Sequence, residues 1–294
     1  HSAVDRFRQQ RRERIGHALL PVRRRPTSAC MTSWFPSLTN APFVAVIRLQ
    51  GPIANSGRGL DDMSLAPVIE KAFSRGRPKA VALQINSPGG SPVQSSLIAA
   101  RIRRLADEKK VPVFAFVEDV AASGGYWLAC AADEIYLDEG SIAGSIGVIS
   151  AGFGFDGIIS KNGVERRVHT AGKSKSLLDP FKPEKPEDVA RLKGWLDQMH
   201  EVFIDYVKGR RGDKLADEPD LFTGDVWIGR KAVEVGLADG IGHLAPVMQE
   251  RFGKKIKYRR YGVRRSIFSR LGAAVVRDAI AEIEDRAAFA RYGL

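Results

Sequence analysis

The chain has 294 residues, 44% of them hydrophobic, which is enough to bury the core of one large domain or two modest ones. Its two cysteines, Cys30 and Cys130, lie in a polar stretch and an apolar stretch, so the composition excludes a disulfide framework and a cysteine-based metal site. We therefore expect neither a metal ion nor a disulfide.

The formal net charge of +12 is concentrated in two basic segments. Residues 1–30 carry eight arginines against two acidic residues, and residues 251–270 carry nine lysines and arginines and no acidic residue. Such segments favour an anionic surface, either lipid or nucleic acid, although solvated basic tails are an equally simple interpretation. Nucleic acid is the weaker candidate, because neither segment interleaves its charges with aromatic residues for base stacking.

The sequence gives no sign of a membrane span or a secretory signal. No apolar run approaches the ~20 residues that a spanning helix needs, and residues 1–30 lack the apolar region of a signal peptide. We therefore expect a cytoplasmic or peripherally membrane-associated protein. Residues 1–40, which end in a stretch rich in Pro, Ser, Thr and Asn, are interpreted as a flexible basic leader.

The first half of the chain alternates apolar runs of strand length with runs of helical apolar spacing. Strands are predicted at residues 43–49, 79–85, 111–117 and 134–137, and helices at residues 64–73, after Pro92, and at residues 126–132. This alternation predicts βαβ units, and therefore an α/β fold with a mostly parallel sheet that is covered on both faces.

The second half is richer in helices. They are predicted at residues 156–162, 188–208, 229–235, 243–251 and 268–292, with strands at residues 164–168 and 255–261. The helix at 188–208 has seven apolar residues expected to face a core, from Leu192 to Val207. The last helix is interpreted as a docking or oligomerisation helix. The predicted organisation is a leader (1–40), a catalytic-type domain (41–245), and a C-terminal extension of basic edge strand and helix (246–294).

The most informative stretch is Val120-Ala-Ala-Ser-Gly-Gly-Tyr-Trp127, between a predicted strand and a predicted helix. A serine at such a junction sits on a sharp turn, and the glycines after it leave room for a substrate backbone. The following helix directs free N–H groups toward the serine. Ser123 is therefore a candidate nucleophile, although a glycine turn with a solvated serine has the same local pattern.

A nucleophilic serine also needs an oxyanion hole and a base. Two backbone N–H groups are candidates for the hole: that of Gly124, next to the serine, and that of Gly90 in a second Gly-Gly turn after the preceding predicted strand. Because the carboxyl ends of parallel strands meet at one edge of the sheet, we expect these two loops to converge.

The base is harder to assign. Of five histidines, only His169 lies near a plausible sheet edge, and it is equally well explained as a polar residue at a strand end. Lys173 and Lys175 lie in a glycine- and serine-rich loop, and a lysine can act as a base if burial lowers its pKa. Ser145, in Gly144-Ser-Ile-Gly147, could orient such an amine. A loop lysine is otherwise simply solvated.

One further pattern is rejected. Residues 152–157 form a G-x-G-x-x-G motif, but it falls in mid-chain, and the region about 20 residues on is basic and free of acidic residues. This context does not fit a dinucleotide site, so no cofactor is expected.

Five segments together resemble the signal peptide peptidase A family of serine peptidases. They are Asn86-Ser-Pro-Gly-Gly-Ser91, Ala122-Ser-Gly-Gly-Tyr126, Gly144-Ser-Ile-Gly-Val148, Gly172-Lys-Ser-Lys-Ser176 with Asp179-Pro-Phe181, and Gly236-Leu-Ala-Asp239. The resemblance covers residues 43 to about 245 in family order. It implies a Clp-protease/crotonase-type fold of repeated ββα units and serine endopeptidase activity on apolar peptides such as cleaved signal peptides.

The resemblance also implies residue roles. Ser123 matches the family's nucleophile, Lys175 rather than Lys173 matches the general base, and Ser145 matches the serine that supports the lysine. Because the chain has one copy of each motif, the resemblance implies that Ser123 and Lys175 meet across a subunit boundary in a ring-like homo-oligomer. Many family members carry an N-terminal membrane anchor, which is not seen in this sequence.

Two other interpretations remain. A crotonase-like acyl-CoA enzyme would use the same oxyanion architecture with a carboxylate at the active edge, and Glu118 and Asp119 are the nearest candidates. A catalytically inactive membrane-associated scaffold would account for the basic ends.

Overall fold

The computed structural model describes residues 41–55, 59–172, 174–262 and 288–294. The expected leader at residues 1–40 lies outside the described residues, as does most of the expected last helix, residues 268–292. The proposed boundary at residue 245 stays a prediction.

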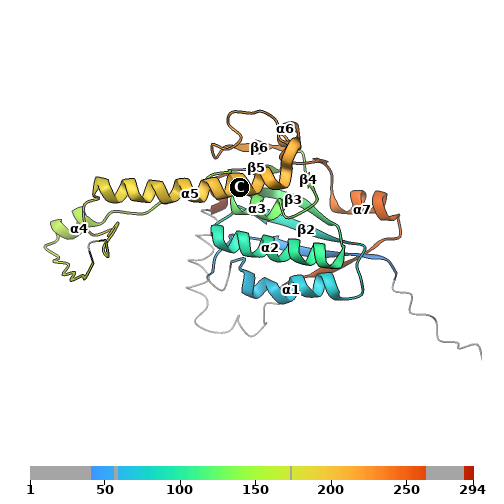
Figure 1. The fold of residues 1–294 in the computed structure, drawn as a ribbon, viewed down its shortest axis with the longest axis horizontal. Helices are drawn as coiled ribbons and strands as arrows, with labels where there is room; N and C mark the ends of the chain where they lie inside the picture. The colour runs from blue at the N-terminus through green and yellow to red at the C-terminus, as the bar shows by residue number, and fades with distance from the viewer. Residues whose placement is uncertain (1–40, 56–58, 173, 263–287) are drawn as a thin grey trace, which may run out of the picture. The chain divides into compact units, whose positions relative to one another are not determined.

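The centre of the fold is one eight-stranded sheet (Figure 1). Its main path runs β6-β5-β3-β2-β1-β8, and β4 pairs with β3 and with β7. All of these pairs are parallel except β5 with β6, so the mostly parallel α/β sheet expected from the sequence is confirmed. The strands are β1 (Phe43–Gln50), β2 (Ala80–Ser87), β3 (Val113–Ala122), β4 (Glu134–Leu137), β5 (Ile142–Gly144), β6 (Val226–Ile228), β7 (Gly240–Ile241) and β8 (Lys257–Tyr261).

Helices cover both faces of the sheet. The helices of the described chain are α1 (Asp62–Ser74), α2 (Pro92–Lys109), α3 (Gly124–Ala129), α4 (Asp156–Lys161), α5 (Pro186–Arg211), α6 (Gly229–Glu234) and α7 (Leu244–Phe252), of which α4 lies away from the sheet (Figure 1). Helices α1, α2 and α3 contribute to the larger core, and α7 contributes Met248 to a smaller core. Successive residues of β1 alternate between the two, with Ala45 and Ile47 in the larger core and Val44 and Val46 in the smaller, as a strand requires.

Strand β3 is longer than expected and places Ser123 directly after its last residue. The short strands β5 and β6 were not predicted, because three-residue strands carry no usable periodicity. The strand predicted at residues 164–168 is wrong: this stretch is largely exposed and has no strand partner. Isolated extended residues do not form a ladder without a neighbouring strand.

Helix α5 reaches beyond the sheet, and α4 lies near its N-terminal end (Figure 1). The apolar residues of α5 were expected to face a core, but only Phe203 and Val207, near the C-terminal end of this helix, are buried apolar residues. Trp195 and Met199 remain 46% and 39% exposed. We call residues 149–199 the arm; its other exposed apolar residues are Ile149, Phe153, Phe155, Ile158, Val164 and Phe181. The arm therefore presents an apolar surface.

The segment Asp179-Pro-Phe181 holds the arm together. Asp179 pairs with Arg166, whose guanidinium lies 4.5 Å from the centre of the Phe181 ring. The carbonyl of Pro180 accepts a 2.6 Å hydrogen bond from the N–H of Phe155. The loop that contains Lys175 is thus anchored at one end against the segment that leads into α4.

The segment Gly236-Leu-Ala-Asp239 joins α5 to the sheet. The Asp239 carboxylate accepts hydrogen bonds from Arg211 (2.7 Å), Lys214 (2.6 Å) and the backbone N–H of Ile135 (2.8 Å). Burial alone would raise the pKa of Asp239, but these donors outweigh it and hold the pKa below its usual value. Arg211 is itself buried, with only 3% of its side chain exposed.

We expect Asp239→Asn to lower the free energy of unfolding by about 3 kcal/mol, because it leaves the buried Arg211 guanidinium without its counter-charge. The folded-state pKa lies below the unfolded value of ~3.9, so the stabilisation is present above that pH and is lost as the pH falls through the folded-state pKa. Urea denaturation at pH 7 and at pH 3 measures both effects. Lys214→Met is the control, since this lysine is half exposed and should cost less than ~1 kcal/mol. If Asp239→Asn and Lys214→Met lowered the free energy of unfolding equally at pH 7, the pairing of Asp239 with the buried Arg211 would not be the main source of the stabilisation.

Among the described residues, no helix combines the length and apolarity needed to cross a membrane.

Candidate active site

Ser123 occupies the turn between β3 and α3 in a backbone conformation that L-residues rarely adopt. Its φ is +51° and its ψ is −121°. The turn is held by a 2.8 Å hydrogen bond from the Ser123 N–H to the carbonyl of Gly144 in β5. A positive φ at a non-glycine residue costs of order 1 kcal/mol or more, and such strain concentrates at functional sites. The turn leaves the serine side chain partly exposed above the sheet edge.

The two Gly-Gly turns converge, as the sequence predicted. A Cβ built on Gly89 would lie 2.9 Å from the Cβ of Ser123 and 2.8 Å from the backbone nitrogen of Gly124. A Cβ built on Gly124 would lie 3.4 Å from the backbone nitrogen of Gly90. Only glycine permits this close approach of the two turns. The φ angles of Gly89 and Gly90, +97° and +139°, are a second reason why these positions require glycine.

The N–H groups of Gly90 and Gly124 are both available to a ligand. Gly124 is the first residue of α3, where an N–H has no partner within its own helix. Within the described part of the chain, no carbonyl or side chain accepts a hydrogen bond from either group. The two donors lie beside Ser123, which is the arrangement that a tetrahedral oxyanion requires.

A cavity of about 340 Å³ opens above Ser123, and we call it the Ser123 cleft. Gly90, Gly124 and Ser145 line it together with Ser123. Its apolar walls are formed by Trp127, Val148, Ile149, Met199 and Phe203. Four of the five predicted site residues therefore lie in one cleft whose wall is partly apolar.

Ser145 shares the unusual backbone of Ser123. Its φ is also +51°, and its N–H donates a 2.7 Å hydrogen bond to the carbonyl of Asp225, just before β6. Strand β5 joins the two serines: it ends at Gly144, next to Ser145, and Gly144 accepts from the Ser123 N–H. The unpredicted β5–β6 pair is thus what places Ser145 at the cleft.

Lys175 does not line the Ser123 cleft of its own chain. Its side chain is exposed, in the arm, where its N–H bonds to the carbonyl of Gly172 at 3.2 Å. Lys173 lies outside the described residues. His169 is also exposed and does not line the cleft. No lysine is among the residues that line this cleft within the described part of the chain.

Several residues of the cleft carry no sequence signal. His200 in α5 lines it, with its Nε2 atom 2.9 Å from the carbonyl oxygen of Ile146. This contact ties α5 to the loop that carries Ser145. Arg291 and Tyr292 also line the cleft, from a segment distant in the sequence. Helical periodicity alone indicates for His200 only a mid-helix position at the border between the buried and exposed faces.

Helix α3 is fixed from below by Tyr126. This residue is fully buried, and its hydroxyl donates a 2.8 Å hydrogen bond to the carbonyl of Leu237. Burial raises the pKa of Tyr126 well above its usual value, so the phenol stays protonated. At the other end of α3, the guanidinium of Arg210 donates to the carbonyl of Cys130 at 2.7 Å. Together, these two bonds fix the position of α3, whose N-terminus directly follows Ser123.

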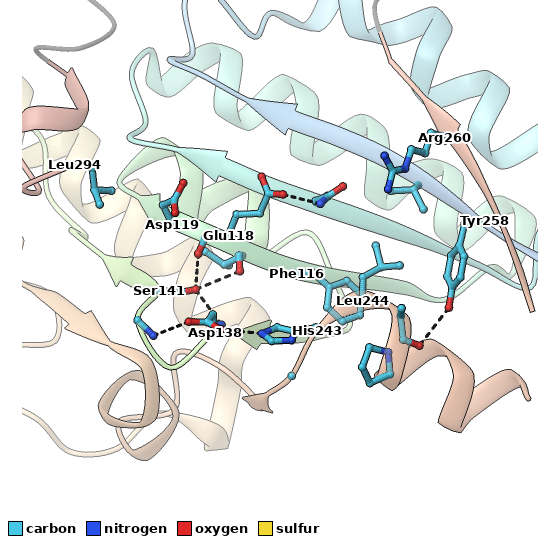
Figure 2. A pocket seen from close by; sticks show the side chains of 17 residues that line it. Phe116, Glu118, Asp119, Asp138, Ser141, His243, Leu244, Tyr258, Arg260 and Leu294 are labelled. Atoms are coloured by element: carbon cyan, nitrogen blue, oxygen red, sulfur yellow. Dashed lines mark hydrogen bonds and ion pairs between the residues drawn. The ribbon is translucent and has the colours of Figure 1, made fainter. Parts of the chain in front are cut away.

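A second cavity, of about 630 Å³, lies between the sheet and the start of α7 (Figure 2). Glu118, Asp119, Asp138 and His243 line it. Asp138 accepts hydrogen bonds from the N–H of Gly140 at 2.9 Å and from His243 at 2.8 Å, which lower its pKa. Glu118 and Asp119, the carboxylates considered for acyl-CoA chemistry, line this second cavity and not the Ser123 cleft.

In the ranges that the structure describes, no group of three or more His, Cys, Asp or Glu side chains is arranged to hold a metal ion. Among the described residues that line the Ser123 cleft, His200 is the only one of these four residue types.

Comparison with known proteins places these residues in context. The model of peptidase family S49 matches residues 105–254, a span that includes Ser123, Ser145 and Lys175. A protein of Brucella melitensis biotype 1 named Na(+)/H(+) antiporter NhaA is 46% identical over 271 residues, which cover 85% of this chain and 37% of that protein. The chloroplastic serine protease SPPA of Arabidopsis thaliana is 32% identical over 202 residues, covering 68% of this chain and 30% of that protein.

Among solved structures, a mutant of the membrane-bound stomatin-specific protease 1510-N in complex with a substrate peptide aligns with a TM-score of 0.47 and 15% identity, over 79% of this chain and 96% of that one. The chain spans about a third of the length of the first two curated relatives named above. The family model matches about half of the chain, including Ser123, Gly124, Ser145 and Lys175, and Gly90 lies before the matched span. The chain therefore belongs to peptidase family S49.

Proposed function

We propose that this chain is a serine endopeptidase that hydrolyses peptide bonds in apolar peptides, such as cleaved signal peptides. Ser123 is the nucleophile, Lys175 the general base, and Ser145 the residue that orients the lysine amine. One observation carries the proposal: the strained turn of Ser123 lies beside the unbonded N–H groups of Gly90 and Gly124 in a single cleft.

The chemistry follows from these roles. The neutral amine of Lys175 takes the proton of Ser123 as Oγ attacks the carbonyl carbon of the scissile bond. The N–H groups of Gly90 and Gly124 stabilise the negative charge that develops on the carbonyl oxygen. The intermediate then collapses to an acyl-enzyme, and Lys175 donates its proton to the departing amine. Water hydrolyses the ester with Lys175 again acting as the base.

An apolar substrate is supported by the walls of the cleft. Trp127, Met199 and Phe203 offer an apolar surface, and the described lining residues include no carboxylate that would select a basic side chain. Burial of an apolar side chain against such a wall is favourable by ~25 cal/mol per Å². An extended peptide with apolar side chains near the scissile bond fits this lining best.

The lysine is supplied by a second copy of the chain. Lys175 does not line its own cleft, and the arm that carries it has several exposed apolar side chains, including Phe153 at 82%. Packing of the arm on a neighbouring protomer would bury these side chains and bring an amine to the neighbour's Ser123. A closed ring satisfies this head-to-tail arrangement at every protomer.

The acyl-CoA interpretation is not favoured by the site. The acyl-CoA interpretation needed Glu118 or Asp119 at the active edge, and both line the second cavity. The antiporter name belongs to a longer relative of which the match covers 37%. An anionic membrane surface remains a predicted partner of the basic segments and is compatible with peptidase activity.

The proposal is tested by treating the wild-type protein with a serine-directed phosphonate and mapping the adduct by mass spectrometry. We expect a single adduct on Ser123, with parallel loss of cleavage of an apolar fluorogenic peptide. Diluting the protein below the concentration at which the oligomer dissociates should lower the labelling rate of Ser123, because the protomer that supplies Lys175 is then no longer bound. An adduct on another serine, or turnover of an enoyl-CoA by phosphonate-resistant protein, would overturn the assignment.

A further inference from the structure

The segment Ala288–Leu294 lies against the cleft that contains Ser123. Phe289 and Tyr292 pack on a small buried cluster formed by Val120, Ala122 and Ile142. These three residues belong to β3 and β5, immediately before Ser123 and Ser145. The segment is therefore seated on the two strands that build the site.

The same segment enters the cleft. Arg291 and Tyr292 are among its lining residues, and the hydroxyl of Tyr292 donates a 3.4 Å hydrogen bond to Oγ of Ser145. Phe289 and Tyr292 are partly buried, although the residues between them are exposed. Two aromatic anchors with exposed residues between them are the pattern of a segment docked on a surface.

The contact with Ser145 competes with the proposed chemistry. The roles proposed above require the Lys175 amine of a neighbour to reach Oγ of Ser145 and Ser123. A serine hydroxyl has one donor and two acceptor sites, and Tyr292 uses one of the acceptors while its ring fills space beside it. The amine and the apolar substrate must therefore fit into the cavity of about 340 Å³ that Tyr292 lines, or displace Tyr292 from its wall.

We propose that Ala288–Leu294 is an intramolecular ligand of the Ser123 cleft, which an apolar peptide or the incoming lysine amine must displace. This inference rests on the proposed function, because it regulates the same site. The aromatic anchors give the segment the chemistry of the apolar substrates it excludes. The hydrogen bond to Ser145 is long and therefore weak, so it does little to oppose displacement of the segment.

The first test compares the rate of phosphonate labelling of Ser123 in full-length variants at equal protein concentration. We expect Ser123 to be labelled about tenfold faster in Tyr292→Ala than in wild type. This ratio corresponds to ~1.4 kcal/mol of free energy with which the segment holds the cleft closed in the wild-type protein. Tyr292→Phe, which loses only the hydroxyl, should show a smaller increase. Ala290→Ser, an exposed position in the same segment, is the matched control and should label like wild type. An unchanged or slower rate in Tyr292→Ala would overturn the proposal.

The second test does not depend on catalysis. Hydrogen–deuterium exchange of the backbone amides at residues 141–148 should be faster in Tyr292→Ala than in wild type, at unchanged melting temperature. If no variant is labelled by the phosphonate, the proposed function fails, while faster exchange would still support the docked segment. Exchange that is identical in the two proteins would contradict docking, whatever the labelling result.

Discussion

A mixture of two inactive variants, Ser123→Ala and Lys175→Ala, is expected to recover roughly a quarter of wild-type peptidase activity. Each variant alone should lose at least about 10⁴-fold in kcat, because the nucleophile or its base is gone. In a mixed ring, a site formed by Ser123 of one protomer and Lys175 of the next is intact whenever the two wild-type groups happen to meet. Random assembly brings them together at about one site in four.

The measurement is cleavage of an apolar fluorogenic peptide after co-expression of the two variants, with mixed rings verified by native mass spectrometry. Lys173→Ala is the matched control: it removes a lysine two residues away in the same loop and should retain activity. Mixed rings without activity would show that both groups act within one chain. Wild-type activity in Lys175→Ala alone would remove the lysine from the mechanism.

Gly90→Ala is expected to lower kcat by about 10²–10³-fold, the usual cost of removing one oxyanion donor. A Cβ on Gly90 would lie 2.1 Å from the carbonyl oxygen of Ile53, so the loop must move, and its φ of +139° is strained for alanine. The displaced loop would carry the Gly90 N–H away from Ser123. KM should change little, since the donor acts mainly on the transition state.

Steady-state kinetics on Gly90→Ala and on Gly209→Ala separates this effect from a general loss of stability. A Cβ on Gly209, in α5, would meet nothing within 4 Å, and alanine favours a helix. Melting curves check that both variants fold. An unchanged kcat in a folded Gly90→Ala protein would exclude Gly90 from the oxyanion hole.

The sequence predicted the sheet and the convergence of the glycine turns because both follow from general rules. Alternation of strand and helix patterns predicts a parallel sheet, and parallel strands bring their carboxyl ends to one edge. Residues 86–91 and 122–126 therefore had to meet. The membership in peptidase family S49 agrees with the resemblance that those same motifs carry.

The rest of the site depends on contacts that no local pattern encodes. Strands β5 and β6 have three residues each, yet they place Ser145. The apolar spacing of α5 predicted burial, but only Phe203 and Val207 of the predicted face are fully buried, because periodicity indicates an apolar face without saying which chain covers it. The docking of Tyr292 links positions 147 residues apart through one hydroxyl contact. Lys175 was selected only by resemblance, and its role stays a proposal.

The backbone of Ser123 has a consequence for how this protein can change over time. At a φ of +51°, glycine would be free of the steric cost that serine bears, so substitution by glycine would relax the turn. Folding alone therefore disfavours serine at this position, which is expected if Ser123 has the nucleophilic role proposed for it. If selection for catalysis were lost, substitution of Ser123 by glycine would be among the first changes to accumulate, because it would abolish the proposed activity without destabilising the fold.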